Sequence, residues 1–215
     1  PLQYLLGKCP WRDFELEVNE AVLIPRQETE LLVEFARRKF DNHSRGVWVD
    51  LGTGSGALAI ALSKSFPLWE GHAVDCSQSA LIVAKRNIKR LSANTQIHCH
   101  LGIWWEPLHP YFGSIDLVLA NPPYIPSQLM DKLDPLVKDN EPYKALCGGM
   151  EGLDHSIEIL SGAFEALKPG GWIMIEHHYD QSEKLLELML DSGLGDIGFE
   201  KDLNGIKRFA IGRRP

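Results

Sequence analysis

Between residues 46 and 193, short apolar segments rich in β-branched residues alternate with longer segments whose apolar residues recur at helical spacing. Such alternation predicts a mostly parallel sheet with helices on both faces, the doubly wound α/β class. The short segments, predicted as strands, are 46–52, 71–76, 95–102, 114–124 and 172–178. The predicted helices are 57–66, 77–91, 154–171 and 182–193; the third is stopped by Lys168, Pro169 and two glycines, and the fourth by a glycine.

The two ends of the chain add smaller elements. Two further strands are expected at 197–203 and 206–213, and the turn through Asn204 and Gly205 between them is a strong hairpin signal. The sheet should therefore end in an antiparallel hairpin. Residues 1–40 are expected to form a linker or hairpin and a helix that lead into the main domain at 41–215.

Composition narrows the functional classes. The chain of 215 residues is 44% hydrophobic and 24% charged, as in ordinary globular proteins. It contains neither a run of about 20 apolar residues nor a signal peptide, so a soluble intracellular protein is expected. The net charge of -7 argues against direct binding of nucleic acid. The four cysteines lack zinc-binding spacing, which predicts reduced thiols and no metal site.

A glycine-rich loop follows the first long strand. Gly52-Thr53-Gly54-Ser55-Gly56 has glycine at every second position, which lets the backbone turn tightly and approach a ligand. The spacing is GxGxG rather than the GxGxxG of nicotinamide-cofactor sites. A tight turn without a ligand is the alternative. Asp75 ends the next strand about 20 residues later, where an acid accepts hydrogen bonds from ribose hydroxyls, so the pair indicates a nucleoside ligand.

The strand at 114–124 runs into Asn121-Pro122-Pro123-Tyr124. Two prolines stop the strand and fix the backbone rigidly. The Asn121 side-chain oxygen and the Pro122 carbonyl then offer two neighbouring acceptors, and the Tyr124 ring can stack on a flat group. Together they fit a planar NH2 group and would hold its lone pair toward an electrophile. The alternative is a loop that merely ends the strand.

The DxGxGxG pattern followed by a strand-ending acid is similar to that of Rossmann-like class I S-adenosylmethionine-dependent methyltransferases. In that superfamily the glycine loop faces the methionine part of the cofactor. Trp104, just past the third strand, lies where the superfamily encloses the adenine. Its alternative interpretation is a core or surface aromatic residue.

Longer stretches resemble one family, the protein-(glutamine N5) methyltransferases of the HemK/PrmC type. The family methylates the glutamine of a Gly-Gly-Gln motif in peptide chain release factors, using S-adenosylmethionine. The matching stretches are PLQYLLG at 1–7, LIPRQETELLVE at 23–34, DLGTGSGALAIAL at 50–62, AVDCS at 73–77, NPPYIP at 121–126, the EPYKAL and GGMEGLD run at 141–154, and LKPGGWIMIEH at 167–177.

This resemblance implies roles for individual residues. Gly52 to Gly56, Asp75 and Trp104 would bind S-adenosylmethionine, with Asn121 beside it, and Asn121 to Tyr124 would hold the glutamine amide and carry catalysis. Residues 41–215 would form the methyltransferase domain. The family has a small helical domain before PLQYLLG, and no counterpart is expected here.

Arg26 and the overall function leave alternatives open. Arg26 either closes the site over cofactor or peptide, or anchors the start of the helix that follows through nearby acids. The first functional hypothesis is glutamine methylation in a release factor, in the cytoplasm or in an organellar stroma or matrix. The second is amino-methylation of adenine or guanine in a nucleic acid, and the third is a non-catalytic nucleotide-binding scaffold.

Overall fold

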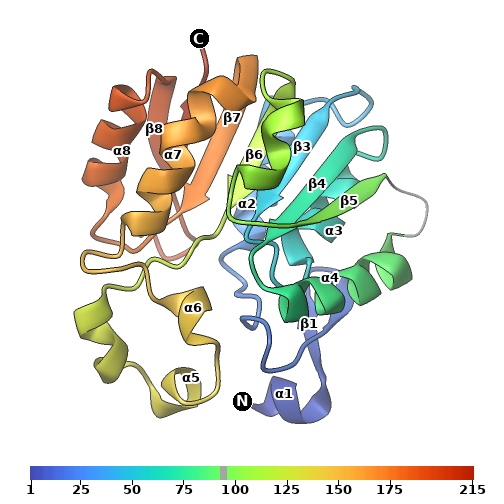
Figure 1. The fold of residues 1–215 in the computed structure, drawn as a ribbon, viewed down its shortest axis with the longest axis vertical. Helices are drawn as coiled ribbons and strands as arrows, with labels where there is room; N and C mark the ends of the chain where they lie inside the picture. Colours follow the sequence, from blue (N-terminus) through green and yellow to red (C-terminus); the bar gives the residue numbers. More distant parts are fainter. Residues whose placement is uncertain (93–95) are drawn as a thin grey trace.

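A seven-stranded sheet forms the centre of the molecule (Figure 1), and the computed structural model describes residues 1–92 and 96–215. The strand order is β5-β4-β3-β6-β7-β9-β8. The pairings from β5 to β7 are parallel, and β9 is antiparallel to both β7 and β8, so the predicted sheet and hairpin are confirmed. The strands are β3 (Val47–Leu51), β4 (Glu70–Asp75), β5 (Ile97–Leu101), β6 (Ile115–Ala120), β7 (Leu167–Glu176), β8 (Gly195–Lys201) and β9 (Lys207–Arg213).

Helices cover both faces of this sheet. Side chains of α2, α3 and α4 belong to one buried cluster, and side chains of α7, α8 and the 3-10 helix η1 belong to the other. Strand β6 serves both clusters, because Leu117 and Leu119 face the first while Val118 and Ala120 face the second. This burial on both faces explains its unbroken apolar sequence. The bounds are α2 (Glu30–Lys39), α3 (Ala57–Ser65), α4 (Gln78–Leu91), η1 (Glu106–Tyr111), α7 (Asp154–Ala166) and α8 (Ser182–Asp191).

The N-terminal segment packs onto the first of these clusters. A short helix, α1 (Leu2–Leu6), precedes an antiparallel hairpin of β1 (Lys8–Trp11) and β2 (Phe14–Glu17). Trp11 is 1% exposed and lies in the same buried cluster as helix α3. The hairpin thus shares its core with the central sheet.

The segment between β6 and α7 contains short helical turns where the sequence indicated only a loop. These are η2 (Ser127–Lys132), α5 (Pro135–Lys138) and α6 (Tyr143–Leu146), which Figure 1 shows beyond the ends of β6 and β7. The Asp134 side chain accepts a hydrogen bond from the Leu136 N–H, and Pro135 occupies the first helical position. Such turns are too short to produce a periodic apolar pattern.

The predicted helix stop at Lys168, Pro169 and the two glycines is confirmed, but the strand that follows starts at Leu167 and not at 172. Helix α7 ends at Ala166, and residues 167–171 are already part of β7. Pro169 forces the residue before it into an extended conformation, and the backbone of Gly170 bonds that of Arg214. The remaining predicted strands and helices of the sheet region are confirmed within a few residues, although Thr95 of the predicted strand 95–102 lies outside the described residues.

Among the described residues, no helix is long and apolar enough to cross a membrane.

Candidate active site

The carboxyl ends of β3, β4, β5 and β6 border one cavity of about 630 Å³, a volume typical of small-molecule sites. Its wall also includes the segment before α2 and residues 142–145. Parallel strands bring their carboxyl ends to one edge of a sheet, so loops distant in sequence meet there. The predicted residues in the wall are Arg26, Gly52, Thr53, Gly54, Ser55, Asp75, Trp104, Asn121 and Pro123, whereas Gly56, Pro122 and Tyr124 do not line the cavity.

The glycine loop adopts a backbone that other residues avoid. Gly52, Gly54 and Gly56 have φ angles of 78°, 54° and 85°. A Cβ at Gly56 would also be in van der Waals contact with the backbone of Ala84 in α4, at 3.4 Å. The N–H groups of Gly52 and Thr53 both bond the Val74 carbonyl, each at 2.9 Å. The loop is thereby held against β4 at the cavity wall.

The buried side chain of Asp50 holds this loop through a hydrogen bond to Thr53. Its side chain is 1% exposed, and its Oδ2 accepts a 2.7 Å hydrogen bond from the Thr53 hydroxyl. Burial raises the pKa of the Asp50 carboxyl to about 7, against the effect of that hydrogen bond. Because the Thr53 hydroxyl is turned toward Asp50, the residue faces the cavity with its backbone.

Asp75 closes the same corner of the cavity. Its two oxygens accept hydrogen bonds from the Gly54 N–H at 2.8 Å and the Ser77 N–H at 2.9 Å. Burial raises the pKa of this carboxyl. A carboxylate oxygen accepts more than one hydrogen bond, so each retains capacity for a ligand hydroxyl.

The two neighbouring tryptophans have different environments. Trp105 is 7% exposed and donates to the Ile159 carbonyl within the core. Trp104 lines the cavity with a φ of 44°, and its ring lies beside Gly52. Its indole N–H donates to Glu158 at 2.8 Å. Trp104 is therefore a cavity aromatic, not a core residue.

Asn121 lies directly after β6 and is anchored by its nitrogen. Its Nδ2 donates to the Thr29 hydroxyl oxygen at 3.1 Å, and Thr29 in turn donates to Glu176 Oε2 at 2.7 Å. The Tyr124 hydroxyl donates to the other oxygen of Glu176 at 3.2 Å. One buried carboxylate at the end of β7 thus connects both polar residues of the NPPY stretch.

Thr29 and Glu176 were not singled out from the sequence. They are 5% and 1% exposed. Burial raises the pKa of the Glu176 carboxyl to about 7, although the hydrogen bonds from Thr29 and Tyr124 oppose the shift. Signals were present: Glu176 ends a strand at the same sheet edge, and Thr29 belongs to the IPRQETE stretch.

The rest of the NPPY stretch is fixed from behind. Pro122 is buried, and the Tyr124 hydroxyl points inward to Glu176. Burial and the neighbouring Glu176 carboxylate raise the pKa of the Tyr124 hydroxyl. The Tyr124 carbonyl accepts from the Gln181 side chain at 3.0 Å. Gln181 also donates to the carbonyls of Glu151 and Gly152, so it ties the NPPY stretch to the GGMEGLD run.

Arg26 pairs across the cavity rim instead of with acids of α2. Its guanidinium lies 2.8 Å from Glu141, whose side chain is 1% exposed. Glu141 also accepts from the Ile24 N–H at 3.2 Å. The ion pair therefore joins the segment before α2 to the segment before α6, two walls of the cavity.

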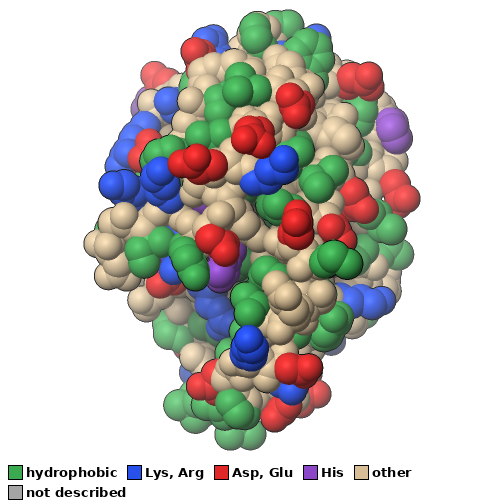
Figure 2. Space-filling model, turned by 90° about the vertical axis from the view of Figure 1, so that its left-hand side faces the viewer, with side chains coloured by type: hydrophobic (Ala, Val, Ile, Leu, Met, Phe, Trp, Pro, Cys, Tyr) green, Lys and Arg blue, Asp and Glu red, His purple; other side chains and the backbone are tan. Residues whose placement is uncertain are grey.

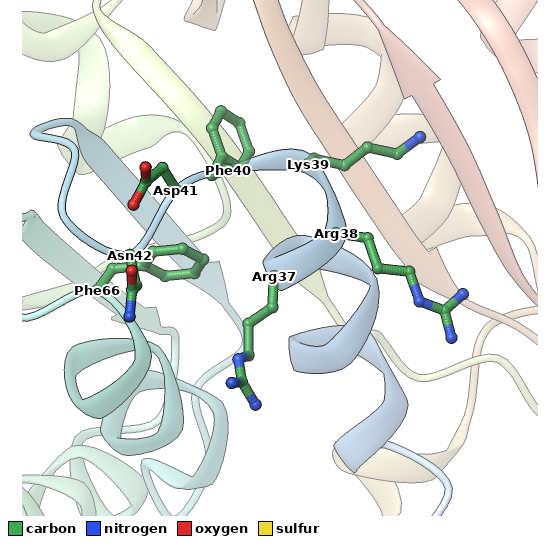
Figure 3. A pocket seen from close by; sticks show the side chains of 7 residues that line it. All are labelled: Arg37, Arg38, Lys39, Phe40, Asp41, Asn42 and Phe66. Atoms are coloured by element: carbon green, nitrogen blue, oxygen red, sulfur yellow. The ribbon is translucent and has the colours of Figure 1, made fainter.

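A second hollow lies at the C-terminal end of α2 (Figure 3). Its three basic side chains point in different directions. Arg37 pairs with Glu34, Arg38 lies over the Phe35 ring, and Lys39 lies over the Trp172 ring. These side chains do not converge on a common point, so the hollow lacks the features of an anion site.

Comparisons with known proteins agree with this geometry. The family described as Methyltransferase small domain matches residues 27–134. The release factor glutamine methyltransferase of Prochlorococcus marinus is 54% identical, covering 100% of this chain and 74% of that protein. The protein of the same name from Synechocystis is 41% identical, covering 99% of this chain and 73% of that protein.

Solved structures share the fold at low identity. The hMettl16 catalytic domain, in complex with a MAT2A 3′UTR hairpin, has a TM-score of 0.72 at 17% identity, covering 93% of this chain and 74% of that one. The ribosomal protein L11 methylase from Lactobacillus delbrueckii has a TM-score of 0.65 at 18% identity, and the alignment covers 92% of this chain and 84% of that one. On the sequence identity of its relatives, the chain belongs to the release factor glutamine methyltransferase family, whose members are S-adenosylmethionine-dependent enzymes.

Proposed function

We propose that this chain transfers a methyl group from S-adenosylmethionine to the side-chain amide nitrogen of the glutamine in the Gly-Gly-Gln motif of a peptide chain release factor. The observation that carries the proposal is the anchored Asn121 amide. Its nitrogen is used by Thr29, which leaves its oxygen as an acceptor at the wall of the cavity. Two relatives that align along nearly the whole chain are named for this activity.

The residues present fit the cofactor. The positive φ angles of Gly52, Gly54 and Gly56 let the loop backbone approach a ligand, and we assign the loop, with Thr53 and Ser55, to the methionine part. Asp75 would accept from the ribose hydroxyls, and the Trp104 ring would cover the adenine, with Asn121 beside the methyl group. S-adenosylmethionine supplies an electrophilic methyl carbon on a positively charged sulfur.

The chain's own residues would orient the substrate amide. The Asn121 side-chain oxygen and the Pro122 carbonyl accept one N–H each, and the Tyr124 ring and Pro123 bound the amide plane. An amide nitrogen is a poor nucleophile, and these two acceptors stabilise the positive charge that develops on it. The nitrogen releases its proton to water as the N–C bond forms and the bond between the methyl carbon and the sulfonium sulfur breaks, with its electron pair left on the now neutral sulfur, so no strong base is required. Arg26 would contact the bound peptide at the rim.

The partner follows from the same assignment. A release factor acts in translation, which would locate the enzyme in the cytoplasm or in an organelle with bacterial-type ribosomes. In Figure 2, separate acidic side chains are scattered over the face, and the basic side chains form one group at its left edge with others spread over the rest of the view. With a net charge of -7, the chain is poorly suited to hold a nucleic acid.

The test is a methylation assay with S-adenosylmethionine and either a release factor or DNA and RNA. We expect a mass increase of one methyl group on the release-factor glutamine, located by peptide mass spectrometry. A release factor whose glutamine is replaced by alanine serves as the control and should remain unmodified. Transfer only to nucleic acid would refute the proposal and establish base methylation instead.

A further inference from the structure

A continuous chain of hydrogen bonds runs from Glu176 to the wall of the cavity. Glu176 Oε2 accepts from the Thr29 hydroxyl at 2.7 Å, and the Thr29 oxygen accepts from the Asn121 amide at 3.1 Å. Thr29 and Glu176 are almost fully excluded from solvent. Water is therefore a poor substitute for either partner, and the direction of each bond is fixed by the groups themselves.

Counting protons sets that direction. When Glu176 is ionised it only accepts, so in that state the single hydroxyl proton of Thr29 is directed at Glu176. The Thr29 oxygen is then available only as an acceptor toward Asn121, and the Asn121 NH2 group must face it. The Asn121 oxygen is consequently left on the opposite side of the amide.

The two orientations of the Asn121 amide have nearly the same shape but opposite polarity. With its oxygen available, Asn121 can accept an N–H from a substrate carboxamide. With the amide rotated by 180°, its NH2 would confront the substrate NH2, so the accepting bond would be lost and two donors would oppose each other. The shape of the site does not favour either orientation. A carboxylate that accepts the Thr29 proton does, because the Thr29 oxygen can then only accept from the Asn121 NH2 group.

We propose that Glu176 is a positioning residue for methyl transfer, which acts through Thr29 to fix the polarity of the Asn121 amide and acts directly on the Tyr124 hydroxyl. This inference rests on the proposed glutamine methylation. Its chemistry implies a preference for substrates that present a planar NH2 group to the site.

The cost of placing Glu176 here supports a role other than stability. Its side chain is 1% exposed and lacks an ion-pair partner among the described residues, since the nearby Arg208 pairs with Asp202 at 2.6 Å. Burial raises the pKa of Glu176, so its charged form is disfavoured by the fold. A buried carboxylate serving only structure would be better replaced by an uncharged group.

The experiment compares Glu176→Gln, Thr29→Val and Thr29→Ser with the unaltered chain. Glu176→Gln keeps the shape but introduces a donor, and Thr29→Val removes the hydroxyl at nearly constant volume. For both, we expect kcat on the release factor to fall about 10- to 100-fold. The Kd for S-adenosylmethionine, measured by calorimetry, should stay within about twofold. Thr29→Ser retains the hydroxyl and should restore kcat to within about threefold of the unaltered chain.

Two controls separate the possible failures. Glu165→Gln makes the same chemical change on the exposed face of α7 and should leave kcat unchanged. A double variant, Glu176→Gln with Thr29→Val, should be no slower than the slower single variant, because both interrupt one chain. If Glu176→Gln or Thr29→Val keeps kcat within twofold, the positioning role is refuted. If the unaltered chain fails to methylate the release factor, the proposed function itself is refuted.

Discussion

Asn121 divides its functions between the two ends of one amide. Its nitrogen donates to Thr29 within the protein. In the proposed reaction its oxygen accepts a hydrogen bond from the substrate. A residue that contributes mainly when charge develops in the transition state should affect turnover far more than cofactor binding.

Asn121→Ala should therefore lower kcat/KM for methyl transfer by about 100- to 1000-fold, or about 3 to 4 kcal/mol. The Kd for S-adenosylmethionine should change little, because the glycine loop and Asp75 remain intact. Steady-state kinetics and calorimetry measure the two quantities. Loss of cofactor binding with normal turnover at saturation would show that Asn121 serves the cofactor instead.

Glu176 also predicts a pH-dependent stability. Its pKa is raised from 4.5 in a free carboxyl to about 7 in the fold, so the unfolded chain releases this proton first as the pH rises. The stability from this group is present below pH 4.5 and is lost as the pH rises through about 7. Glu176→Gln cannot ionise and so removes that loss. As the pH rises from 4.5 to 8, the free energy of unfolding of the variant should increase by up to about 3 kcal/mol relative to that of the unaltered chain. Urea unfolding of both proteins at pH 4.5 and pH 8 tests this. If the difference in their free energies of unfolding is the same at both pH values, the prediction is contradicted.

At the scale of elements, the GGMEGLD run holds the NPPY stretch in place. The Ile125 N–H bonds the Leu146 carbonyl at 3.0 Å, and the Gly148 N–H bonds the Ile125 carbonyl at 2.9 Å. Gly152 lies so close that an added Cβ would overlap the Tyr124 carbonyl oxygen and the Gln181 side chain. The geometry of the NPPY stretch therefore depends on a segment about 25 residues downstream.

Gly152→Ala should displace the NPPY stretch and lower both kcat and thermal stability. Gly113→Ala is a matched control, because Gly113 has a φ of 79° against 75° for Gly152, but an added Cβ there meets no atom within 4 Å. The control should show only the strain of a left-handed alanine, about 1 kcal/mol, with kcat unchanged. Equal losses of stability and unchanged kcat in both variants would exclude the proposed displacement. Thermal melts and turnover with a release factor provide the comparison.

On the scale of the whole molecule, strand β4, next to the edge strand β5 on the side of the sheet far from the terminal hairpin, carries a buried histidine. His72 is 0% exposed, its Nδ1 lies 2.9 Å from His100 Nε2, and its ring also stacks on His98. Glu70 lies 3.4 Å from its other nitrogen, and the Tyr111 ring centroid is 4.1 Å away. Burial and the neighbouring histidines lower the His72 pKa to about 4.

This lowered pKa predicts that the contribution of His72 to the stability of the fold is lost in acid. The unfolded chain takes up a proton at His72 near pH 6.5 while the folded chain resists, so stability is present above pH 6.5 and falls toward pH 4. His72→Phe should reduce the decrease in the free energy of unfolding on acidification by up to about 3 kcal/mol. Glu176 and Asp50 increase the free energy of unfolding on acidification, and they do so in both proteins. Melting temperatures of the two proteins from pH 7.5 to 4.5 test the difference. Parallel curves would show that His72 does not titrate with folding.

Local sequence determined the elements and their order. Apolar periodicity and the positions of glycine and proline depend on nearby residues, so the α/β alternation, the Ser77 cap of α4 and the terminal hairpin were predictable. The start of β7 was predicted at 172 instead of 167 because the helix stop at Lys168, Pro169 and the two glycines overlaps the first residues of the strand. The glycine loop, Asp75 and Asn121 were found because a parallel sheet gathers its strand ends at one edge.

Tertiary structure decided which side chains act together. The Thr29–Glu176 bond joins positions 147 apart, the Arg26–Glu141 pair positions 115 apart and the Gln181–Tyr124 bond positions 57 apart. No local pattern encodes such pairs, because they arise only when the sheet brings separate loops to the same edge. The sequence by itself determined that a rigid acceptor follows β6. Only folding placed a buried carboxylate behind that acceptor, and the direction of the resulting hydrogen bonds depends on that placement.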